Sequence, residues 1–226
     1  MVSLDVSRDF FNPSECTERI NIIGCGAIGS TVAELLVRSG LTNIVLFDFD
    51  IVEAKNVANQ MFRNIDIGKP KVDALVDILS DIDPEIRSRI KTVPSGYTGQ
   101  PLSGYVFLCV DSIDVRKEIV EKYKNSPFIK AMFDFRMRMT DAQHYAADWS
   151  DKKMIQNFIN SMQFTKEEAE ASTPVSACNV TLSLAPTVRT IVAYGVANFM
   201  NFVKDGAKNL KNMILIDAFT YQVNAI

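Results

Sequence analysis

The residues best suited to chemistry form a glycine-rich loop, Gly24-Cys25-Gly26-Ala27-Ile28-Gly29, which follows a short apolar run and opens a helical pattern. Glycines at this spacing permit a tight turn and let backbone amides approach phosphate oxygens, and the N-terminus of the next helix favours negative charge. Asp48 follows about twenty residues later, where a carboxylate at the end of the second strand can accept hydrogen bonds from a ribose diol. The loop and Asp48 therefore predict nucleotide binding, and NAD, FAD and ATP all fit this pattern. The alternative is that the glycines serve only tight packing.

The elements that position these residues alternate between strands and helices in the first half of the chain. Short connections between them favour right-handed βαβ units and a doubly wound, mainly parallel, Rossmann-like α/β sheet. The continuous apolar run before Asp111 is typical of a strand buried on both faces of such a sheet. The expected strands are 19–23, 43–47 and 105–110, and the expected helices are 30–39 and 71–79.

The second half of the chain has a different pattern. Residues 128–139 and 142–147 predict a pair of strands and residues 213–223 a last strand, so we expect the sheet to continue into an antiparallel C-terminal region. Residues 148–174 form a polar stretch that we expect to be mobile. Residues 185–203 predict a mostly apolar helix, whose apolar surface favours a homodimer.

Composition narrows the classes of function. The chain has 226 residues, 47% of them apolar, and a net charge of −3, which excludes the clustered basic face of a nucleic-acid or anionic-membrane surface. Four cysteines without any C-x-x-C pair predict neither a zinc site nor a disulfide framework. The single histidine, His144, excludes mechanisms with two imidazoles, and we expect it to be a surface or packing residue. The N-terminus has no secretory pattern, and Pro186 and Arg189 interrupt the most apolar stretch, so we expect a cytoplasmic protein without a membrane span.

Three motifs beyond the loop carry a resemblance to a known family. They are residues 48–60, residues 66–71 and residues 111–116, and with the loop they resemble the ThiF/MoeB/HesA family of ubiquitin-activating-enzyme-like adenylyltransferases. The resemblance extends from Ile20 to Gly206 and implies a nucleotide-binding α/β domain that uses ATP and Mg²⁺. It implies adenylation of the C-terminal carboxylate of a ubiquitin-like protein, usually by a homodimer.

The resemblance also implies roles for single residues. Lys71 matches the lysine that neutralises triphosphate charge, with Lys69 as the competing candidate, and Asp111 matches the aspartate associated with magnesium and adenylation. A lysine and a metal-binding carboxylate around a polyphosphate suit an in-line displacement, because such catalysis is mostly positioning and charge stabilisation. Alternatively, Lys71 is a solvated surface residue and Asp111 only caps the helix that begins near Val115. The remaining matches are Gly24, Gly26 and Gly29 around the phosphates, Asp48 at the ribose, Asn56 near the nucleotide, and Asp50, which either contributes to the site or only shapes the loop.

Two departures from the family pattern concern positive charge. Asn59 occupies the place of an arginine that assists the triphosphate, and we hypothesise that Arg63 reaches the same phosphates. The family's arginine-bearing N-terminal segment is not recognisable here, and Arg8 is a weak substitute for it.

Cys178 lies where one branch of the family carries a cysteine that links covalently to the carrier protein. It is a candidate acyl acceptor or, alternatively, a small packed residue, whereas Cys16, Cys25 and Cys109 are interpreted as structural.

The sequence as a whole predicts an adenylyltransferase in a single domain over residues 1–226. We expect a nucleotide-binding half at about 18–125 and a partner-binding and dimerisation half at about 126–226. The expected partner is a small ubiquitin-like or sulfur-carrier protein, or a peptide, with a free C-terminal carboxylate. An NAD-dependent oxidoreductase and a non-catalytic carrier-binding module with a degenerate nucleotide site remain the alternatives.

Overall fold

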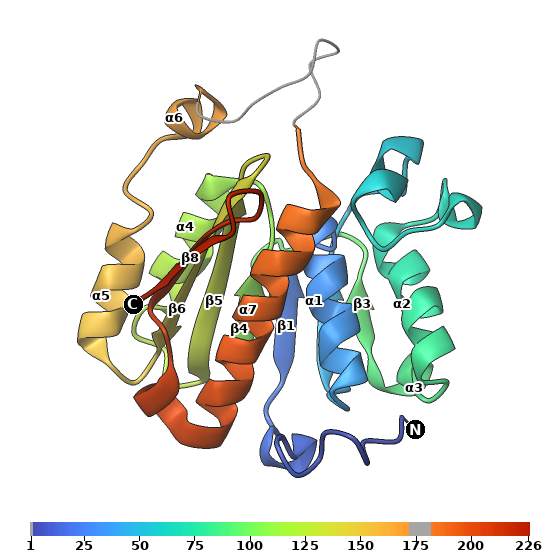
Figure 1. Cartoon of the computed structure of the whole chain (residues 1–226), viewed down its shortest axis with the longest axis horizontal. Helices are drawn as coiled ribbons and strands as arrows, with labels where there is room; N and C mark the ends of the chain where they lie inside the picture. The colour runs from blue at the N-terminus through green and yellow to red at the C-terminus, as the bar shows by residue number, and fades with distance from the viewer. Residues whose placement is uncertain (1, 172–181) are drawn as a thin grey trace.

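A computed structural model describes residues 2–171 and 182–226 of the chain (Figure 1). Within these residues eight strands form one sheet in the order β3-β2-β1-β4-β5-β6-β7-β8. The strands from β3 to β5 in this order are parallel to their neighbours, whereas β6, β7 and β8 are added in antiparallel fashion. The expected mainly parallel sheet that continues into an antiparallel C-terminal region is thus confirmed.

The strands are β1 (Ile20–Ile23), β2 (Ile44–Phe47), β3 (Lys91–Val93), β4 (Gly104–Leu108), β5 (Ile129–Met137), β6 (Asp141–Asp148), β7 (Met213–Asp217) and β8 (Gln222–Ala225). The helices are α1 (Ala27–Arg38), α2 (Lys71–Ile82), α3 (Ile86–Arg89), α4 (Ile113–Tyr123), α5 (Lys152–Asn160), α6 (Lys166–Ala171) and α7 (Ala185–Asp205). Short 3₁₀ turns cover Pro13–Glu15, Ala54–Ala58, Asn64–Asp66 and Gly206–Asn209.

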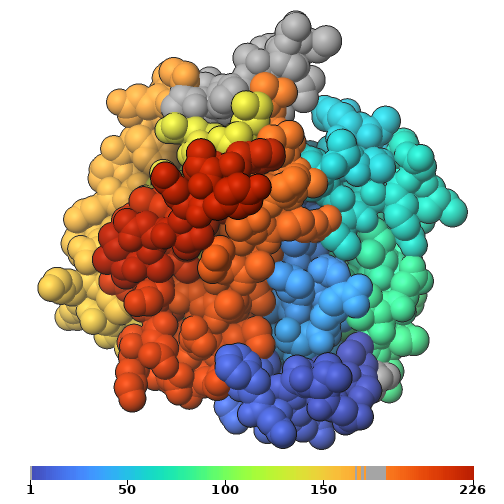
Figure 2. Space-filling model, in the orientation of Figure 1, coloured from blue at the N-terminus to red at the C-terminus, as the bar shows by residue number. Residues whose placement is uncertain are grey.

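Helices cover both faces of the sheet, and the central strands are apolar on both sides for this reason. Ile22 and Phe107 point to the face covered by α1, α2 and α7, while their neighbours Ile23 and Leu108 point to the face covered by α4 and α5. Figure 1 shows α1, α2 and α7 in front of the sheet. In the space-filling view of the same side, the orange surface of α7 lies between the red C-terminal strands and the blue surface of α1 (Figure 2).

The polar stretch at residues 148–174 contains two helices, α5 and α6, in the part of it that the structure describes. Asp151 caps α5 by accepting hydrogen bonds from the backbone N–H groups of Lys153 and Met154, and Ile155 and Phe158 are buried against the sheet. These apolar residues stand three positions apart among polar ones, which is the pattern of an amphipathic surface helix. A second helix, α6, follows.

The C-terminal strand also differs from the expectation. In place of one strand over residues 213–223, β7 and β8 form an antiparallel hairpin, with Asp217 paired to Gln222. The turn is stabilised by Asp217, whose side chain accepts hydrogen bonds from the N–H groups of Phe219 and Thr220. Across residues 2–171 and 182–226, every helix is too short or too polar to span a bilayer.

Candidate functional site

The carboxyl ends of three adjacent parallel strands bring the candidate residues together. Ile23, the last residue of β1, pairs with Phe47 of β2 on one side and with Leu108 of β4 on the other. The glycine loop, Asp48 and Cys109 therefore leave the sheet at the same level. β2 and β3 lie on one side of β1, whereas β4 and β5 lie on its other side, so the strand order reverses between β1 and β4, and such a switch point in an open α/β sheet is where ligands bind.

Close packing explains two of the loop glycines. Gly24 has a φ of +94°, and a Cβ there would lie 2.9 Å from the carbonyl carbon of Cys109. A Cβ on Gly29 would lie only 1.8 Å from the carbonyl oxygen of Gly24. A Cβ on Gly26, in contrast, would meet nothing within 4 Å, and no side chain caps the N-terminus of α1 at this residue. The first turn of α1, which includes Ala27 and Ile28, therefore begins without a side-chain cap and with free space beside Gly26, and uncapped N–H groups at a helix start suit an anion.

A chain of hydrogen bonds joins the loop to Lys71. The Asp48 carboxylate accepts from the N–H of Cys25 at 2.6 Å and from the N–H of Asp50 at 2.8 Å. The Asp50 carboxylate in turn accepts from the Lys71 ammonium at 2.7 Å. Burial raises the pKa of Asp48, although its two N–H donors and the charge of Lys71 act in the opposite direction. Lys71 is buried at the start of α2, so the alternative of a solvated surface lysine is wrong.

Lys69 and Arg63 belong to a separate cluster around the buried Asp66. The Lys69 ammonium contacts Asp66 and Asp77, and the Arg63 guanidinium contacts both oxygens of Asp66 and one of Asp81. Burial alone would raise the pKa of Asp66, but hydrogen bonds from Arg63 and Lys69 outweigh it and lower that pKa. Lys71 is thus the lysine that joins the glycine loop. To bind phosphates, as hypothesised, the Arg63 guanidinium would have to leave the carboxylates of Asp66 and Asp81.

The asparagines shape the segment between Asp50 and Lys71. Asn56 is buried, and its side-chain oxygen accepts from the N–H of Glu53 in a capping box at the start of a 3₁₀ turn that Asn59 ends. Among the described residues, the buried side-chain oxygen of Gln60 has no hydrogen-bond partner. The N–H of Met61 donates to Ser30 on α1, so the segment that carries the family's polar motif packs against the helix that opens the site.

Asp111 follows the end of β4 and is exposed. The alternative that Asp111 only caps the next helix is wrong, because the Ser112 side chain caps α4 by accepting from the N–H of Val115. The Asp111 carboxylate is exposed and is therefore accessible to a magnesium ion. Magnesium is commonly held by one or two carboxylates together with substrate phosphates and water, so a single exposed carboxylate is compatible with such a site. Within residues 2–171 and 182–226, no cluster of three or more His, Cys, Asp or Glu side chains forms a metal site.

The cysteines near the loop are unsuited to nucleophilic chemistry. Burial raises the pKa of Cys25 well above its usual value, and burial does the same for Cys109. Both remain thiols at neutral pH, and the thiolate is the reactive form. Cys178 lies outside the described residues.

His144 packs in the core on β6, which confirms the packing alternative and not the surface one. It is fully buried against Phe133 and Phe135, and burial lowers its pKa to about 4. Its Nδ1 lies 3.2 Å from the carbonyl oxygen of Asp134, and its Nε2 lies 3.2 Å from the side-chain nitrogen of Asn198 on α7. A neutral ring that donates through Nδ1 and accepts at Nε2 satisfies both contacts.

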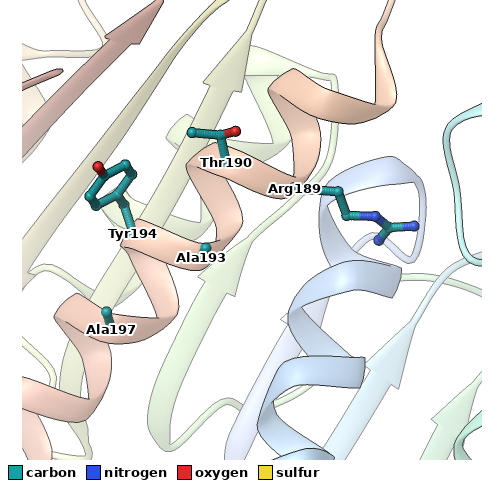
Figure 3. A pocket seen from close by; sticks show the side chains of 5 residues that line it. All are labelled: Arg189, Thr190, Ala193, Tyr194 and Ala197. Carbon is teal, nitrogen blue, oxygen red and sulfur yellow. The ribbon is translucent and has the colours of Figure 1, made fainter. Parts of the chain in front are cut away.

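The outward face of α7 contains a shallow hollow of about 520 Å³. It is lined by Thr190, Ala193, Tyr194 and Ala197 together with Arg189, which Figure 3 shows pointing towards α1. The Arg189 guanidinium donates to the hydroxyl of Thr31 on that helix. The opposite face of α7 is buried on the sheet, so the helix has one packed side and one exposed side made mostly of small residues.

A model of the ThiF family matches residues 16–226. The chain belongs to the ThiF family. This ThiF-family chain is 42% identical to ubiquitin-like modifier-activating enzyme 5 of Oryza sativa over 67 residues, which are 30% of the chain and 16% of that relative. It is 34% identical to the enzyme of the same name from Drosophila virilis over 117 residues, 44% of the chain and 29% of that relative. The matched segments therefore cover less than a third of the length of either relative.

Solved structures share the fold of this ThiF-family chain. A structure of Escherichia coli MccB with ATP superposes with a TM-score of 0.71 at 18% identity, covering 95% of the chain and 65% of MccB. PaaA superposes with a TM-score of 0.71 at 15% identity, covering 98% of the chain and 68% of PaaA. Another structure of MccB holds AMPCPP and the peptide MccA.

Proposed function

We propose that this chain is an ATP-dependent adenylyltransferase. Its substrate would be the C-terminal carboxylate of a ubiquitin-like or sulfur-carrier protein, or of a peptide, which it converts to an acyl-adenylate with release of pyrophosphate. The observation that carries the proposal is the uncapped N-terminus of α1 beside the hydrogen-bonded set of Asp48, Asp50 and Lys71. Family membership and the names of the relatives support it.

Each residue has a role that its geometry allows. The N–H groups at the start of α1 would bind phosphate oxygens next to Gly26, and Asp48 would accept from the ribose hydroxyls. Lys71 is connected to Asp48 through Asp50, which accepts a hydrogen bond from Lys71 and donates one to Asp48. The Lys71 ammonium would leave Asp50 and bind the triphosphate, whose charge it would neutralise. Asp111 would hold magnesium, which supplies further charge neutralisation when bound. Asn56, Asn59 and Arg63 would border the phosphates, with Arg63 released from Asp66.

The proposed reaction is an in-line displacement at the α-phosphorus of ATP. A carboxylate oxygen of the partner forms a bond to this phosphorus, the bond from the phosphorus to the oxygen bridging the α- and β-phosphates breaks, and pyrophosphate leaves with that electron pair. Lys71 stabilises the charge that develops on the leaving group, and the α1 amides hold the phosphates in line. Positioning and charge stabilisation account for most of the rate in such reactions, so no imidazole is required.

In this proposal the two halves of the chain have different functions. Residues at about 18–125 would bind the nucleotide, and residues at about 126–226 would bind the partner and a second copy of the chain.

The homodimer proposal is supported by the exposed face of α7, where Ala193 and Ala197 flank Tyr194 and allow a second helix to approach closely. Ala193→Arg should shift the sedimentation coefficient from that of a dimer to that of a monomer. A wild-type chain that sediments as a monomer would contradict the dimer.

ATP–pyrophosphate exchange tests the proposed function. The chain is incubated with ATP, labelled pyrophosphate and a panel of carrier proteins and peptides, each with a free or an amidated C-terminus. We expect label to enter ATP only with a free carboxylate. Cys178→Ala should leave this exchange intact, and loss of a thiol-sensitive adduct with the carrier would identify Cys178 as the acceptor. Hydride transfer from a reduced nicotinamide without any exchange would favour the oxidoreductase instead.

One observation favours a second candidate, a non-catalytic carrier-binding module. The family's phosphate-assisting arginine is replaced by Asn59, and Arg63, the nearest substitute, is held by Asp66 and Asp81. A module of this kind would bind its partner equally well with and without ATP and would show no exchange. The affinity for the partner, measured with and without ATP, therefore distinguishes the binding module from the adenylyltransferase.

A further inference from the structure

The backbone just before Asp111 is held by an arginine from the next helix. Arg116 is buried on the first turn of α4, and its Nε donates to the carbonyl oxygen of Val110 at 2.9 Å. Its Nη2 donates to the same oxygen. One guanidinium thus fixes the last peptide group before Asp111 through two N–H groups, a geometry that a planar fork of donors provides and a lysine does not.

Arg116 is itself held by Asp134 on β5. Its Nη1 lies 2.8 Å from Oδ1 of Asp134, a fully buried carboxylate, and the other oxygen of that carboxylate accepts from Nε of Arg136 at 2.6 Å. Arg136 continues to the end of α5, where it donates to the carbonyl oxygen of Ser161 at 2.6 Å and to its hydroxyl at 3.0 Å. Its guanidinium also stacks 4.4 Å from the ring centre of Tyr145. These contacts join α4 and β5 to the residues that follow β4 and α5.

Asp111 depends on this support because its own side chain makes no other contact that would hold it. Within residues 2–171 and 182–226, the Asp111 carboxylate has no hydrogen bond or ion pair, and Ser112 is occupied as the cap of α4. A group that must meet a ligand has to be held to within about 0.5 Å, so rigidity has to come from the backbone. Val110 supplies it through Arg116.

We propose that Arg116 is a positioning residue for Asp111, acting through the Val110 carbonyl and oriented by the Asp134 carboxylate. The proposal rests on the proposed function for the role of Asp111. It assigns a purpose to a buried charged set that the adenylation chemistry does not itself use. Arg136 extends the same restraint to α5.

A double-mutant cycle with Asp111 tests this assignment. Arg116→Lys keeps the charge but cannot reach both Val110 and Asp134, and we expect it to slow ATP–pyrophosphate exchange about 10- to 100-fold with little change in the KM for ATP. In an Asp111→Asn background the same substitution should have no further effect, because Arg116 then has nothing to position. Equal slowing in both backgrounds would overturn the proposal. Arg38→Lys, an exposed arginine on α1, is the matched control and should leave the rate unchanged.

Hydrogen exchange provides a readout that needs no substrate. Arg116→Lys should increase amide exchange in peptides that cover residues 109–113, while peptides from β1, β2 and α7 keep their wild-type protection. Unchanged exchange at 109–113 would overturn the proposal even if adenylation were never observed, and an absence of adenylation in the wild type would count only against the proposed function. If Arg116→Lys does not fold, Asp134→Asn, which leaves both arginines in place, should give the same local increase.

Discussion

His144 makes the stability of the fold sensitive to mild acid. The ring is fully buried and its pKa falls from 6.5 to about 4, because burial disfavours the charged form. Asp134, the ionisable group that faces it, opposes this shift through its charge and its carbonyl oxygen. The folded-state pKa lies below the unfolded value, so the contribution of His144 to stability is complete above pH 6.5 and declines as the pH falls towards 4.

The size of the effect follows from the shift. With an unfolded pKa of 6.5 and a folded pKa of about 4, proton linkage removes about 2 kcal/mol of unfolding free energy between about pH 7 and about pH 5. Below the folded pKa the loss reaches about 3 kcal/mol. Such a change is a large fraction of the total stability of a domain of this size.

His144→Gln isolates the contribution of the imidazole. A glutamine offers one donor and one acceptor to the contacts with Asp134 and Asn198 but does not titrate. We expect it to be less stable than the wild type at neutral pH and to lose about 2 kcal/mol less on acidification. Acidic groups such as Asp66 are common to both proteins, so their effects cancel in the comparison.

Urea unfolding followed by the fluorescence of Trp149 measures this difference. Trp149 is the single tryptophan of the chain and is buried, with its Nε1 donating to the carbonyl oxygen of Tyr123 at 2.8 Å. Unfolding free energies are determined for both proteins at neutral and mildly acidic pH, with a check that the denaturant slope stays constant. Equal losses of unfolding free energy on acidification in the wild type and His144→Gln would show that His144 does not cause the acid sensitivity.

Three further predictions concern the candidate site. Lys71→Met should slow ATP–pyrophosphate exchange about 100- to 1000-fold while the protein stays folded by circular dichroism, and a rate within a factor of about three of wild type would remove Lys71 from the site. Gly26→Ala should weaken ATP binding with little change in melting temperature, whereas Gly29→Ala should cost about 1–3 kcal/mol of stability, because its methyl group collides with the Gly24 carbonyl; equal melting temperatures would contradict this contrast. Asp66→Asn should destabilise the fold by about 2 kcal/mol in urea unfolding, because its two cationic partners lose a buried acceptor, and a neutral effect would show that the cluster is dispensable.

Local pattern was sufficient to predict the strands and helices that carry the glycine loop. An apolar run that ends in glycines and a helical spacing after them are encoded within a few residues, so β1, α1 and β2 were predicted close to their observed bounds. The helix α5 was missed because Ile155 and Phe158 are its only buried apolar residues and lie among polar ones. The hairpin of β7 and β8 was missed because its turn interrupts one continuous β-rich run.

Contacts between distant residues could not be predicted in the same way. The ion pair of Asp50 with Lys71 depends on α2 starting beside the end of β2, and the pair of Arg116 with Asp134 depends on β5 lying next to β4. Both arrangements follow from strand order, which a single sequence does not contain. The motif from 111 to 116 did include Arg116, but only the structure shows what its side chain holds.

The mass of the partner after incubation with ATP shows whether the chain adenylates a C-terminal carboxylate. The chain, ATP, magnesium and a carrier protein or peptide with a free C-terminus are mixed, quenched in acid and analysed by mass spectrometry. We expect the partner to gain one AMP, an amidated partner to gain none, and Lys71→Met to abolish the product. A partner that binds the chain tightly but gains no AMP in the presence of ATP and magnesium would rule out the adenylyltransferase.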